Sequence, residues 1–427
     1  MPTFWQQMAQ GAALVAGAAL AYWANSEALR RCGIDADSVP PPGGVIDTDH
    51  AGDPTGILRE AAQRLVQAAL PSPTVAQRRQ AIRNVIRELH TRGITSYTEP
   101  GLGPGGAGTL FGGLSTDNWT AYAELAEAGE LDARVSVLLL PAPMGGSADD
   151  LRKGLAELRR PRSADPRVLR AIGVKIFADG VPPNRTAWMK EPYADGGHGA
   201  LCVHGDTPAL QVDELHEMVR IAHEAGFQLG VHVTGDLAID TVVDAFVSAQ
   251  ALARRPDARH YVIHGDFIGA DSLRRLAANG WGVNMNPAIK WTVSDLMDAV
   301  VGPERSAYQW PVRSAVDAGV TVCASSDAPI TEPDWRQGVA SILLRESKAG
   351  GRPSGPEQCV PLAEALRAYT ANPAWQDFAD TWKGTIEPGK VADLCVLDRP
   401  LLDLEPHAVT EAEVDLTVFD GRVVFER

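Results

Sequence analysis

Cysteine is scarce in this 427-residue chain, and no two cysteines form a C-x-x-C pair. The five are scattered and odd in number: Cys32, Cys202, Cys323, Cys359 and Cys395. That pattern argues against a disulfide framework and against a structural zinc site built from thiolates. It is typical of a reducing compartment, and we expect the protein to be cytoplasmic.

Positive charge is also in short supply. The chain has 39 Lys and Arg residues against 54 Asp and Glu residues, which gives a formal net charge of −15. An acidic protein repels nucleic acid and anionic lipid headgroups, so neither is expected as a partner. The apolar content of 45% is ordinary and provides enough side chains for a sizeable core.

The N-terminus lacks an apolar run long enough for a membrane span. The run QGAALVAGAALAYWA, residues 10–24, is too short to cross a bilayer. No Lys or Arg precedes Arg30, whereas a secretory signal peptide begins with a basic segment. We therefore expect a buried or frayed helix here and no membrane association.

From residue 93 onward, short β-like runs alternate with longer amphipathic segments. Continuous apolar strands between helices indicate a parallel sheet that is covered on both faces. Such a sheet is either doubly wound or closed into a barrel. Seven strands are expected, at residues 93–99, 133–141, 173–180, 227–236, 260–266, 280–287 and 319–327.

Polar side chains stand at the C-terminal end of nearly every predicted strand. A barrel gathers these ends into one ring at its mouth, whereas an open sheet concentrates its site at a switch point. The pattern therefore favours a TIM-like (β/α)8 barrel, of which seven strands are identifiable. The residues concerned are Glu99, Lys175, Asp179, His232, Asp236, His264, Asp266, Asn286 and Asp327.

The flanking segments differ from the barrel pattern. Residues 1–60 are predicted to form an N-terminal helix and a Pro/Gly-rich loop insertion over the barrel mouth. Residues 61–380 form the catalytic barrel with an incomplete first strand, and residues 381–427 carry short β runs with turn signals. We expect this last segment to be the remnant of a small β-sandwich.

Two histidines on consecutive predicted strands point to a metal site. His232 in LGVHVTGD and His264 in YVIHGDF both follow runs of aliphatic residues. One strand histidine is more often a hydrogen-bonded core residue, but two at neighbouring strand ends can reach one ion. Asp327 ends the last strand, where its alternative role is a helix cap. Beside the histidines it is better interpreted as a metal ligand and general base.

Lys175 lies in the middle of the apolar run GVKIFADG. A buried ammonium is costly unless it is paired, ligated or chemically changed. It either pairs with an acid such as Asp179 or extends to the barrel mouth, or its amine reacts with carbon dioxide to give a carboxylate that binds metal. Asp179 and Arg185, in the loop that follows, are candidate substrate-binding residues, and a surface role for Arg185 is equally compatible with the sequence.

Together these residues resemble the amidohydrolase superfamily. Within it, VKIFADGV…NRTA…PY, VHVTGDLAID, SSDAPI and the tail GTIEPGKVADLCVLDR…TVFDGRVV resemble the amidohydrolase-3 group, which includes N-substituted formamide deformylases. The resemblance extends from about Tyr22 to Arg427. It implies a (β/α)8 barrel with a composite β-sandwich from both chain ends, and one or two divalent metals, usually zinc. It also implies that Lys175 is the carbamylated lysine and that His232, His264 and Asp327 are metal ligands.

The chain departs from that family pattern in two places. No H-x-H occurs anywhere in the sequence, although the first barrel strand of the family ends in this motif and supplies two metal ligands. Ala19 and Leu20 stand where the family has Gly-His. The chain is therefore interpreted either as truncated or as a degenerate relative.

The resulting expectation is a hydrolase that cleaves an amide or formamide C–N bond of a small molecule through a metal-activated water. Asp327 would take the proton of that water and pass it to the leaving nitrogen. The alternative is a catalytically impaired amidohydrolase-like protein that serves as a scaffold or partner subunit. A third hypothesis is an enzyme that uses the same metal site to deaminate its substrate. A homo-oligomer is compatible with each of these.

Overall fold

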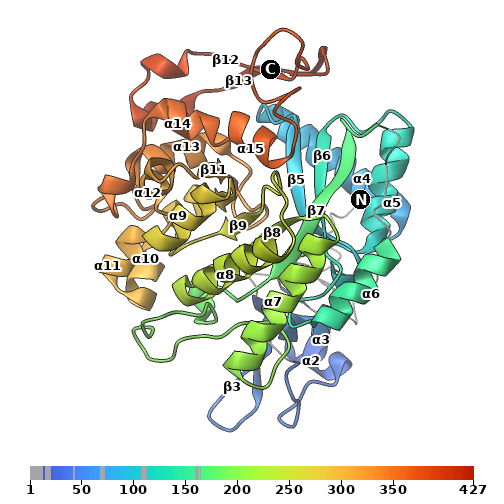
Figure 1. Ribbon diagram of the computed structural model, residues 1–427, viewed down its shortest axis with the longest axis vertical. Coiled ribbons are helices and arrows are strands. Elements are labelled where there is room, and N and C mark those ends of the chain that lie inside the picture. The colour runs from blue at the N-terminus through green and yellow to red at the C-terminus, as the bar shows by residue number, and fades with distance from the viewer. Residues whose placement is uncertain are drawn as a thin grey trace.

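The fold is known from a computed structural model (Figure 1), which describes residues 13–14, 21–41, 44–67, 73–106, 113–158, 163 and 165–427. Its centre is a seven-stranded parallel sheet in the order β11-β10-β9-β8-β7-β6-β5. The strands are β5 (Ser96–Leu102), β6 (Arg134–Leu139), β7 (Leu169–Phe177), β8 (Gln228–Val233), β9 (Tyr261–His264), β10 (Gly282–Met285) and β11 (Thr321–Ala324). All seven predicted strands are confirmed, and the sheet curls into a half-barrel.

Helices alternate with these strands and cover the outside of the sheet (Figure 1). Central strands such as β6 and β8 are buried at every position, as expected for a parallel sheet with both faces covered. The helices are α4 (Val75–Thr91), α5 (Thr116–Glu127), α6 (Ala148–Leu158), α7 (Pro208–Glu224), α8 (Asp236–Leu252), α9 (Ala270–Ala278), α10 (Pro287–Val301), α11 (Pro303–Tyr308), α12 (Val312–Asp317), α13 (Trp335–Leu344), α14 (Leu362–Arg367) and α15 (Ala371–Gln376). Within the described ranges, no helix is both long and apolar enough to cross a membrane.

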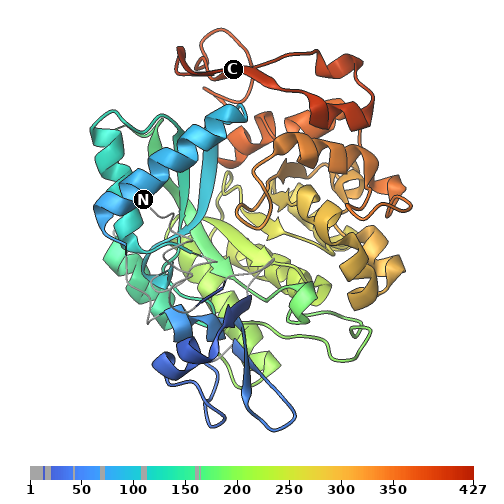
Figure 2. The same cartoon turned by 180° about the vertical axis from the view of Figure 1, so that it is seen from behind.

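The barrel is open at one seam. Strands β5 and β11 are the two edges of the sheet and, among the described residues, no strand pairs with the free side of either. In β5, residues 96–99 are only partly buried, unlike the fully buried β6. Figure 2 shows this side, with α4 and β5 on one flank and the helices that follow β11 on the other. The seam lies where a closed eight-stranded barrel would have its first strand.

Residues 21–67 form a small separate sheet rather than the predicted helix and loop. Strands β2 (Ala21–Ala24), β3 (Gly44–Thr48) and β4 (Pro54–Glu60) pair antiparallel, with β1 (Ala13–Leu14) at one edge. Short helices α2 (Ser26–Cys32) and α3 (Arg64–Gln67) complete the unit. The rest of the N-terminal apolar run, including Ala19 and Leu20, lies outside the described residues.

This N-terminal sheet packs on loops at the barrel mouth. Arg59 donates to the Asn184 carbonyl at 3.1 Å, and Glu60 accepts hydrogen bonds from Asn184 Nδ2 at 3.0 Å and Thr186 Oγ1 at 2.7 Å. Both partners follow β7, so the sheet lies over the C-terminal ends of the strands. Burial raises the pKa of the Glu60 carboxyl to about 7.

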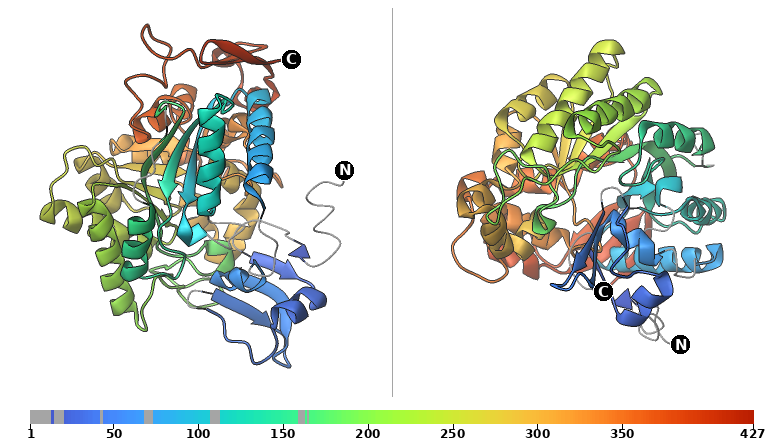
Figure 3. Two further views of the ribbon diagram at one scale, coloured as in Figure 1. Left: turned by 90° about the vertical axis from the view of Figure 1, so that its right-hand side faces the viewer. Right: turned by 90° about the horizontal axis from the view of Figure 1, so that it is seen from below.

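The C-terminal segment forms a three-stranded antiparallel sheet at the opposite end of the molecule (Figure 3). Its strands are β12 (Leu394–Leu397), β13 (Val414–Phe419) and β14 (Arg422–Glu426). Arg134, the first residue of β6, holds this sheet through ion pairs with Asp393 at 2.6 Å and Asp420 at 2.8 Å. The composite sandwich implied by the family resemblance is therefore not formed by the described residues, since the two terminal sheets lie at opposite ends.

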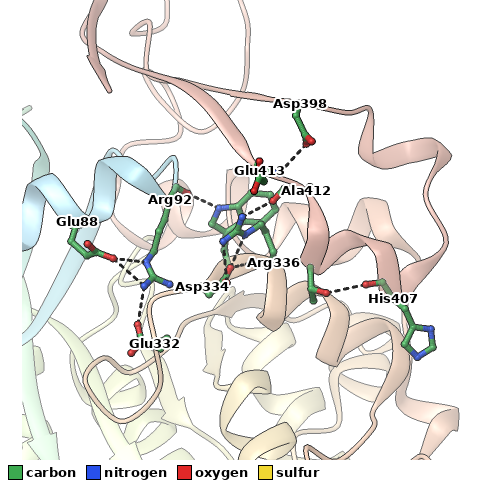
Figure 4. A network of polar contacts seen from close by, with 11 residues as sticks. Glu88, Arg92, Glu332, Asp334, Arg336, Asp398, His407, Ala412 and Glu413 are labelled. Carbon is green, nitrogen blue, oxygen red and sulfur yellow. Dashed lines mark hydrogen bonds and ion pairs between the residues drawn. The ribbon is translucent and has the colours of Figure 1, made fainter. Parts of the chain in front are cut away.

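Polar contacts cross the seam between the end of α4 and the start of α13, next to the C-terminal tail (Figure 4). Arg92, just after α4, pairs with Glu88 at 3.0 Å and with Glu332 at 2.9 Å, and Glu332 lies beyond β11. The indole of Trp335 donates to the Arg92 carbonyl at 2.8 Å, and Arg336 donates to the Ala412 carbonyl in the tail. These contacts join the two flanks of the open sheet without any strand pairing.

A buried pair of histidines connects α7 with the residue that precedes β9. His260 Nδ1 accepts from the Leu229 N–H at 3.0 Å, so its Nε2 carries the proton and donates to His223 Nδ1 at 2.8 Å. His223 Nε2 then donates to the Ala253 carbonyl at 2.6 Å. Every ring nitrogen has a partner only while both rings are neutral. Burial accordingly lowers the pKa of both histidines, that of His260 well below its usual range.

We expect His260→Leu to lower the free energy of unfolding by about 2–4 kcal/mol at pH 7.5, because it leaves the Leu229 N–H and His223 Nδ1 without partners. The folded pKa of His260 lies below its unfolded value, so the wild type loses this stability as the pH falls below about 6.5. The difference between wild type and variant should therefore narrow by about 1 kcal/mol at pH 5.5. Urea unfolding at both pH values measures this difference in the free energy of unfolding. A difference that does not change with pH would contradict the assignment of two neutral histidines.

Candidate active site

One cavity holds the four predicted metal ligands. It has a volume of about 1820 Å³ and is lined by Lys175, His232, His264 and Asp327, together with residues of both edge strands. The lysine and the two histidines are buried, with exposed fractions of 5%, 5% and 7%. Residues from β7, β8, β9 and the end of β11 are thus brought together at the C-terminal ends of the strands, as the barrel interpretation predicts.

The two histidines lie against each other with one nitrogen free on each ring. Their ring centroids are 4.6 Å apart in an edge-to-face arrangement. His232 Nε2 lies 3.1 Å from the Gly180 carbonyl, and since a carbonyl only accepts, Nε2 carries the proton and Nδ1 keeps its lone pair. The second imidazole has the opposite tautomer. His264 Nδ1 donates to Asn286 Oδ1 at 2.6 Å, so its free lone pair is on Nε2.

The orientation of Asn286 supports that assignment. Its Nδ2 donates to Ser325 Oγ at 3.0 Å and to the Ser325 carbonyl at 3.2 Å, so the amide oxygen must face His264. Burial lowers the pKa of His264 to about 3 and that of His232 well below its usual range, with Lys175 adding to both effects. Both imidazoles are therefore neutral at physiological pH, which is the form that binds a metal.

Lys175 and two carboxylates form the charged part of the site. Burial lowers the pKa of the Lys175 ammonium to about 8, while Asp327 and Glu99 oppose that change. Burial raises the pKa of Asp327 to about 6 and that of Glu99 to about 7, and Lys175 counteracts both shifts. A lysine with a pKa near 8 has an appreciable neutral amine fraction at pH 7.5, and the neutral amine is the form that reacts with carbon dioxide.

Two backbone conformations in the site are unusual. His264 has a φ of 74° and Asp327 a φ of 56°, both in the left-handed region that non-glycine residues rarely adopt. Such conformations cost of order 1–3 kcal/mol each and are concentrated at functional sites. Both residues are thus aimed into the cavity at an energetic cost to the fold.

The donor set fits a divalent metal only if Lys175 contributes. Two neutral imidazoles with free nitrogens are suitable ligands. Among the described residues, however, no three His, Cys, Asp or Glu side chains are gathered closely enough to hold an ion. A carboxylate on Lys175 would be the missing third donor, next to the histidines and Asp327.

The structure places the two candidate substrate-binding residues, Asp179 and Arg185, away from the cavity wall. Asp179 is fully buried and its carboxylate accepts the backbone N–H groups of Trp188, Thr234 and Gly235, each at 2.9 Å. It therefore anchors the loops after β7 and β8. Arg185 forms an ion pair with Asp195 at 2.6 Å on the surface. Neither residue lines the cavity, so neither is retained as a substrate-binding residue.

Two residues of the site had no role assigned from the sequence. Glu99 in the middle of β5 lines the cavity and interacts with Lys175, and Asn286 fixes the ring of His264. Their position at the ends of the predicted strands was the available signal. Which strand-end residues face one another depends on sheet register, which the sequence does not specify.

Comparison with known proteins identifies the family. The sequence model of the amidohydrolase family matches residues 6–425. "Putative amidohydrolase YtcJ" of Bacillus subtilis is 29% identical over 94% of this chain and 72% of its own length. The N-substituted formamide deformylase of Arthrobacter pascens is 30% identical over 95% of this chain and 71% of its own length.

A solved structure has the same fold. The chain is similar to an uncharacterized metal-dependent hydrolase from Pyrococcus horikoshii, with a TM-score of 0.68 and 22% identity. The similarity covers 91% of this chain and 71% of the other. Most of the present chain therefore has a counterpart in the fold of a longer chain.

Proposed function

The chain belongs to the amidohydrolase family, and from that premise we propose that it hydrolyses an amide or formamide C–N bond of a small molecule with the help of a bound divalent metal, zinc being the first candidate. The observation that carries the proposal is the pair of neutral imidazoles, His232 and His264, which lie against each other and line one cavity with Lys175. A bound divalent metal would supply Lewis acidity, which acidifies water and polarises a carbonyl.

The chain's own residues would then bind the metal, transfer protons and position the ligands. His232 Nδ1 and His264 Nε2, with a carboxylated Lys175, would hold the ion. Carboxylation joins the Lys175 amine to the carbon of carbon dioxide and releases one proton. Asp327 at the cavity wall would accept a proton from the attacking water and deliver it to the leaving nitrogen. Asn286 would keep His264 in the tautomer that leaves Nε2 free.

The first test is the metal content and activity of the purified chain. We expect about one zinc per chain and hydrolysis of at least one member of a panel of N-alkylformamides and N-acyl amino acids. His264→Ala should lose the metal and the activity, because it removes one of two imidazole ligands. His50→Ala, which changes an exposed histidine, is the matched control and should change neither. Aminated heterocycles in the same panel distinguish deamination from amide hydrolysis.

A second candidate is a protein of amidohydrolase fold without turnover, acting as a scaffold or partner subunit. The absence of a three-donor group among the described His, Cys, Asp and Glu side chains favours it, as does the absence of H-x-H from the sequence. Purified chain with neither zinc nor hydrolysis, in the presence of bicarbonate, would support this candidate and contradict the first.

A further inference from the structure

The wall of the cavity next to His264 carries three polar side chains that the proposed reaction does not use. Asp266 follows β9, and Gln309 and Trp310 connect α11 to α12. All three line the cavity, yet they are almost fully buried, with exposed fractions of 3%, 1% and 2%.

Hydrogen bonds hold these residues in one fixed unit. The backbone N–H of Trp310 donates to the backbone carbonyl of Asp266 at 2.7 Å. The side-chain Nε2 of Gln309 donates to Asp266 Oδ2, also at 2.7 Å. The buried guanidinium of Arg345 donates to the Gln309 carbonyl at 2.8 Å and to the Trp310 carbonyl at 3.0 Å. The loop is therefore preorganised, which reduces the entropy lost on binding a ligand.

Each of the three side chains nevertheless has one polar atom without a partner: Asp266 Oδ1, Gln309 Oε1 and Trp310 Nε1. A carboxylate oxygen accepts a hydrogen bond from Gln309 Nε2, which leaves the amide oxygen as a free acceptor. Each unpartnered buried polar atom destabilises the folded protein by about 1–3 kcal/mol. Native proteins therefore rarely keep three such atoms on neighbouring residues unless a ligand binds them.

The chemistry of the unit specifies its ligand. Two of the free atoms are acceptors, one of them on a carboxyl group. Within the described ranges, the side-chain donor to Asp266 is Gln309, and the charge of Lys290 acts on Asp266 without a direct contact. The nearby Lys290 instead donates to the Ser306 carbonyl at 2.7 Å and to Ser354 Oγ at 3.2 Å. A buried carboxylate without a counterion is stabilised by a cation that also donates hydrogen bonds.

The surroundings of the unit are apolar on one side. Ile289, Val293 and Met297 of α10 line the same cavity and pack with Phe267, the residue after Asp266. A short hydrocarbon chain could therefore lie against them while its charged end reaches Asp266. Such a combination matches an alkylammonium group. The indole N–H of Trp310 remains available for an oxygen of the same ligand.

We propose that Asp266, Gln309 and Trp310 form a subsite for a protonated amine, and that substrates of this chain carry such an amino group on a short alkyl arm. The ammonium donates to Asp266 Oδ1 and Gln309 Oε1. That the ligand is a substrate rests on the proposed hydrolase function, whereas amine binding itself does not.

The test uses ligand pairs that differ only in the amino group. N-(ω-aminoalkyl)formamides with two to four methylenes are compared with N-alkylformamides of equal length as substrates. Butylammonium and 1-butanol are compared as ligands of the full chain by calorimetry. We expect one of the amino compounds to be preferred, and butylammonium to bind more tightly, each by about 10- to 100-fold, as for hydrogen bonds to charged groups.

Asp266→Asn should abolish both preferences, because it replaces the free acceptor with an N–H donor. Asp244→Asn removes the same charge from an exposed residue of α8 and should preserve both. Gln309→Met serves if Asp266→Asn does not fold, and should reduce the preferences. Amine binding without hydrolysis of any compound would overturn the proposed function but not the subsite. Equal binding of butylammonium and butanol to the wild type would overturn the subsite.

Discussion

Replacing Lys175 with alanine is expected to lower hydrolytic activity at least about 1000-fold and to prevent zinc binding. The lysine lines one cavity with the two histidines, and without it the two imidazoles and the carboxylates Asp327 and Glu99 remain. Among the described residues, no three of these side chains are gathered closely enough to hold an ion. Loss of the metal's Lewis acidity removes several kcal/mol of transition-state stabilisation, which accounts for the size of the effect. Zinc titration and kcat/KM on the responsive formamide measure the two losses separately.

Carbon dioxide provides an independent check on the role of Lys175. If its carboxylate is the third donor, then wild-type chain stripped of bicarbonate should bind zinc weakly and recover when bicarbonate is restored. Lys190→Ala changes a half-exposed lysine that pairs with Asp240 and should behave like the wild type. Full zinc binding and turnover by Lys175→Ala would show that the site does not use this residue as a ligand.

Asp327→Asn is expected to lower kcat about 100- to 10,000-fold, the usual contribution of a positioned general base. Asparagine has the same shape as aspartate but cannot accept a proton at this pH. The negative charge of Asp327 raises the pKa of Lys175, so its removal should lower that pKa and favour the neutral amine. Zinc binding through Lys175 and the histidines should therefore largely persist while turnover is lost.

The contrast between metal content and rate makes that prediction specific. Asp317→Asn alters an exposed carboxylate at the end of α12 and should leave kcat unchanged. Equal losses of zinc and activity in Asp327→Asn would mean that Asp327 acts mainly as a ligand. An unchanged kcat would exclude it as the base.

Individual elements show why parts of the prediction succeeded. The strand that carries Lys175 and the strands that carry His232 and His264 were identified because buried parallel strands are continuous apolar runs between amphipathic helices. The barrel interpretation placed their polar C-terminal ends in one ring, and the structure brings Lys175, His232, His264 and Asp327 to one cavity.

The N-terminal region shows where local pattern failed. The apolar run that ends in Ala21–Ala24 was expected to form a buried or frayed helix, and alanine is indeed the strongest helix former. In the structure these residues pair with β4, about 35 residues further along the chain. Such non-local pairing overrides weak local preference. The same reasoning explains Asp179, whose three backbone donors come from separate loops that no sequence spacing reveals.

The sequence by itself determined the kind of fold, the family and four residues that line one cavity, because burial periodicity and strand-end polarity are local properties of the sequence. Only the tertiary structure decided which nitrogens of His232 and His264 are free and that Glu99 interacts electrostatically with Lys175. It also decided that Asp266, Gln309 and Trp310 form one hydrogen-bonded unit. Those properties depend on distances between residues on different elements, and these distances arise only when the sheet register and helix packing are fixed.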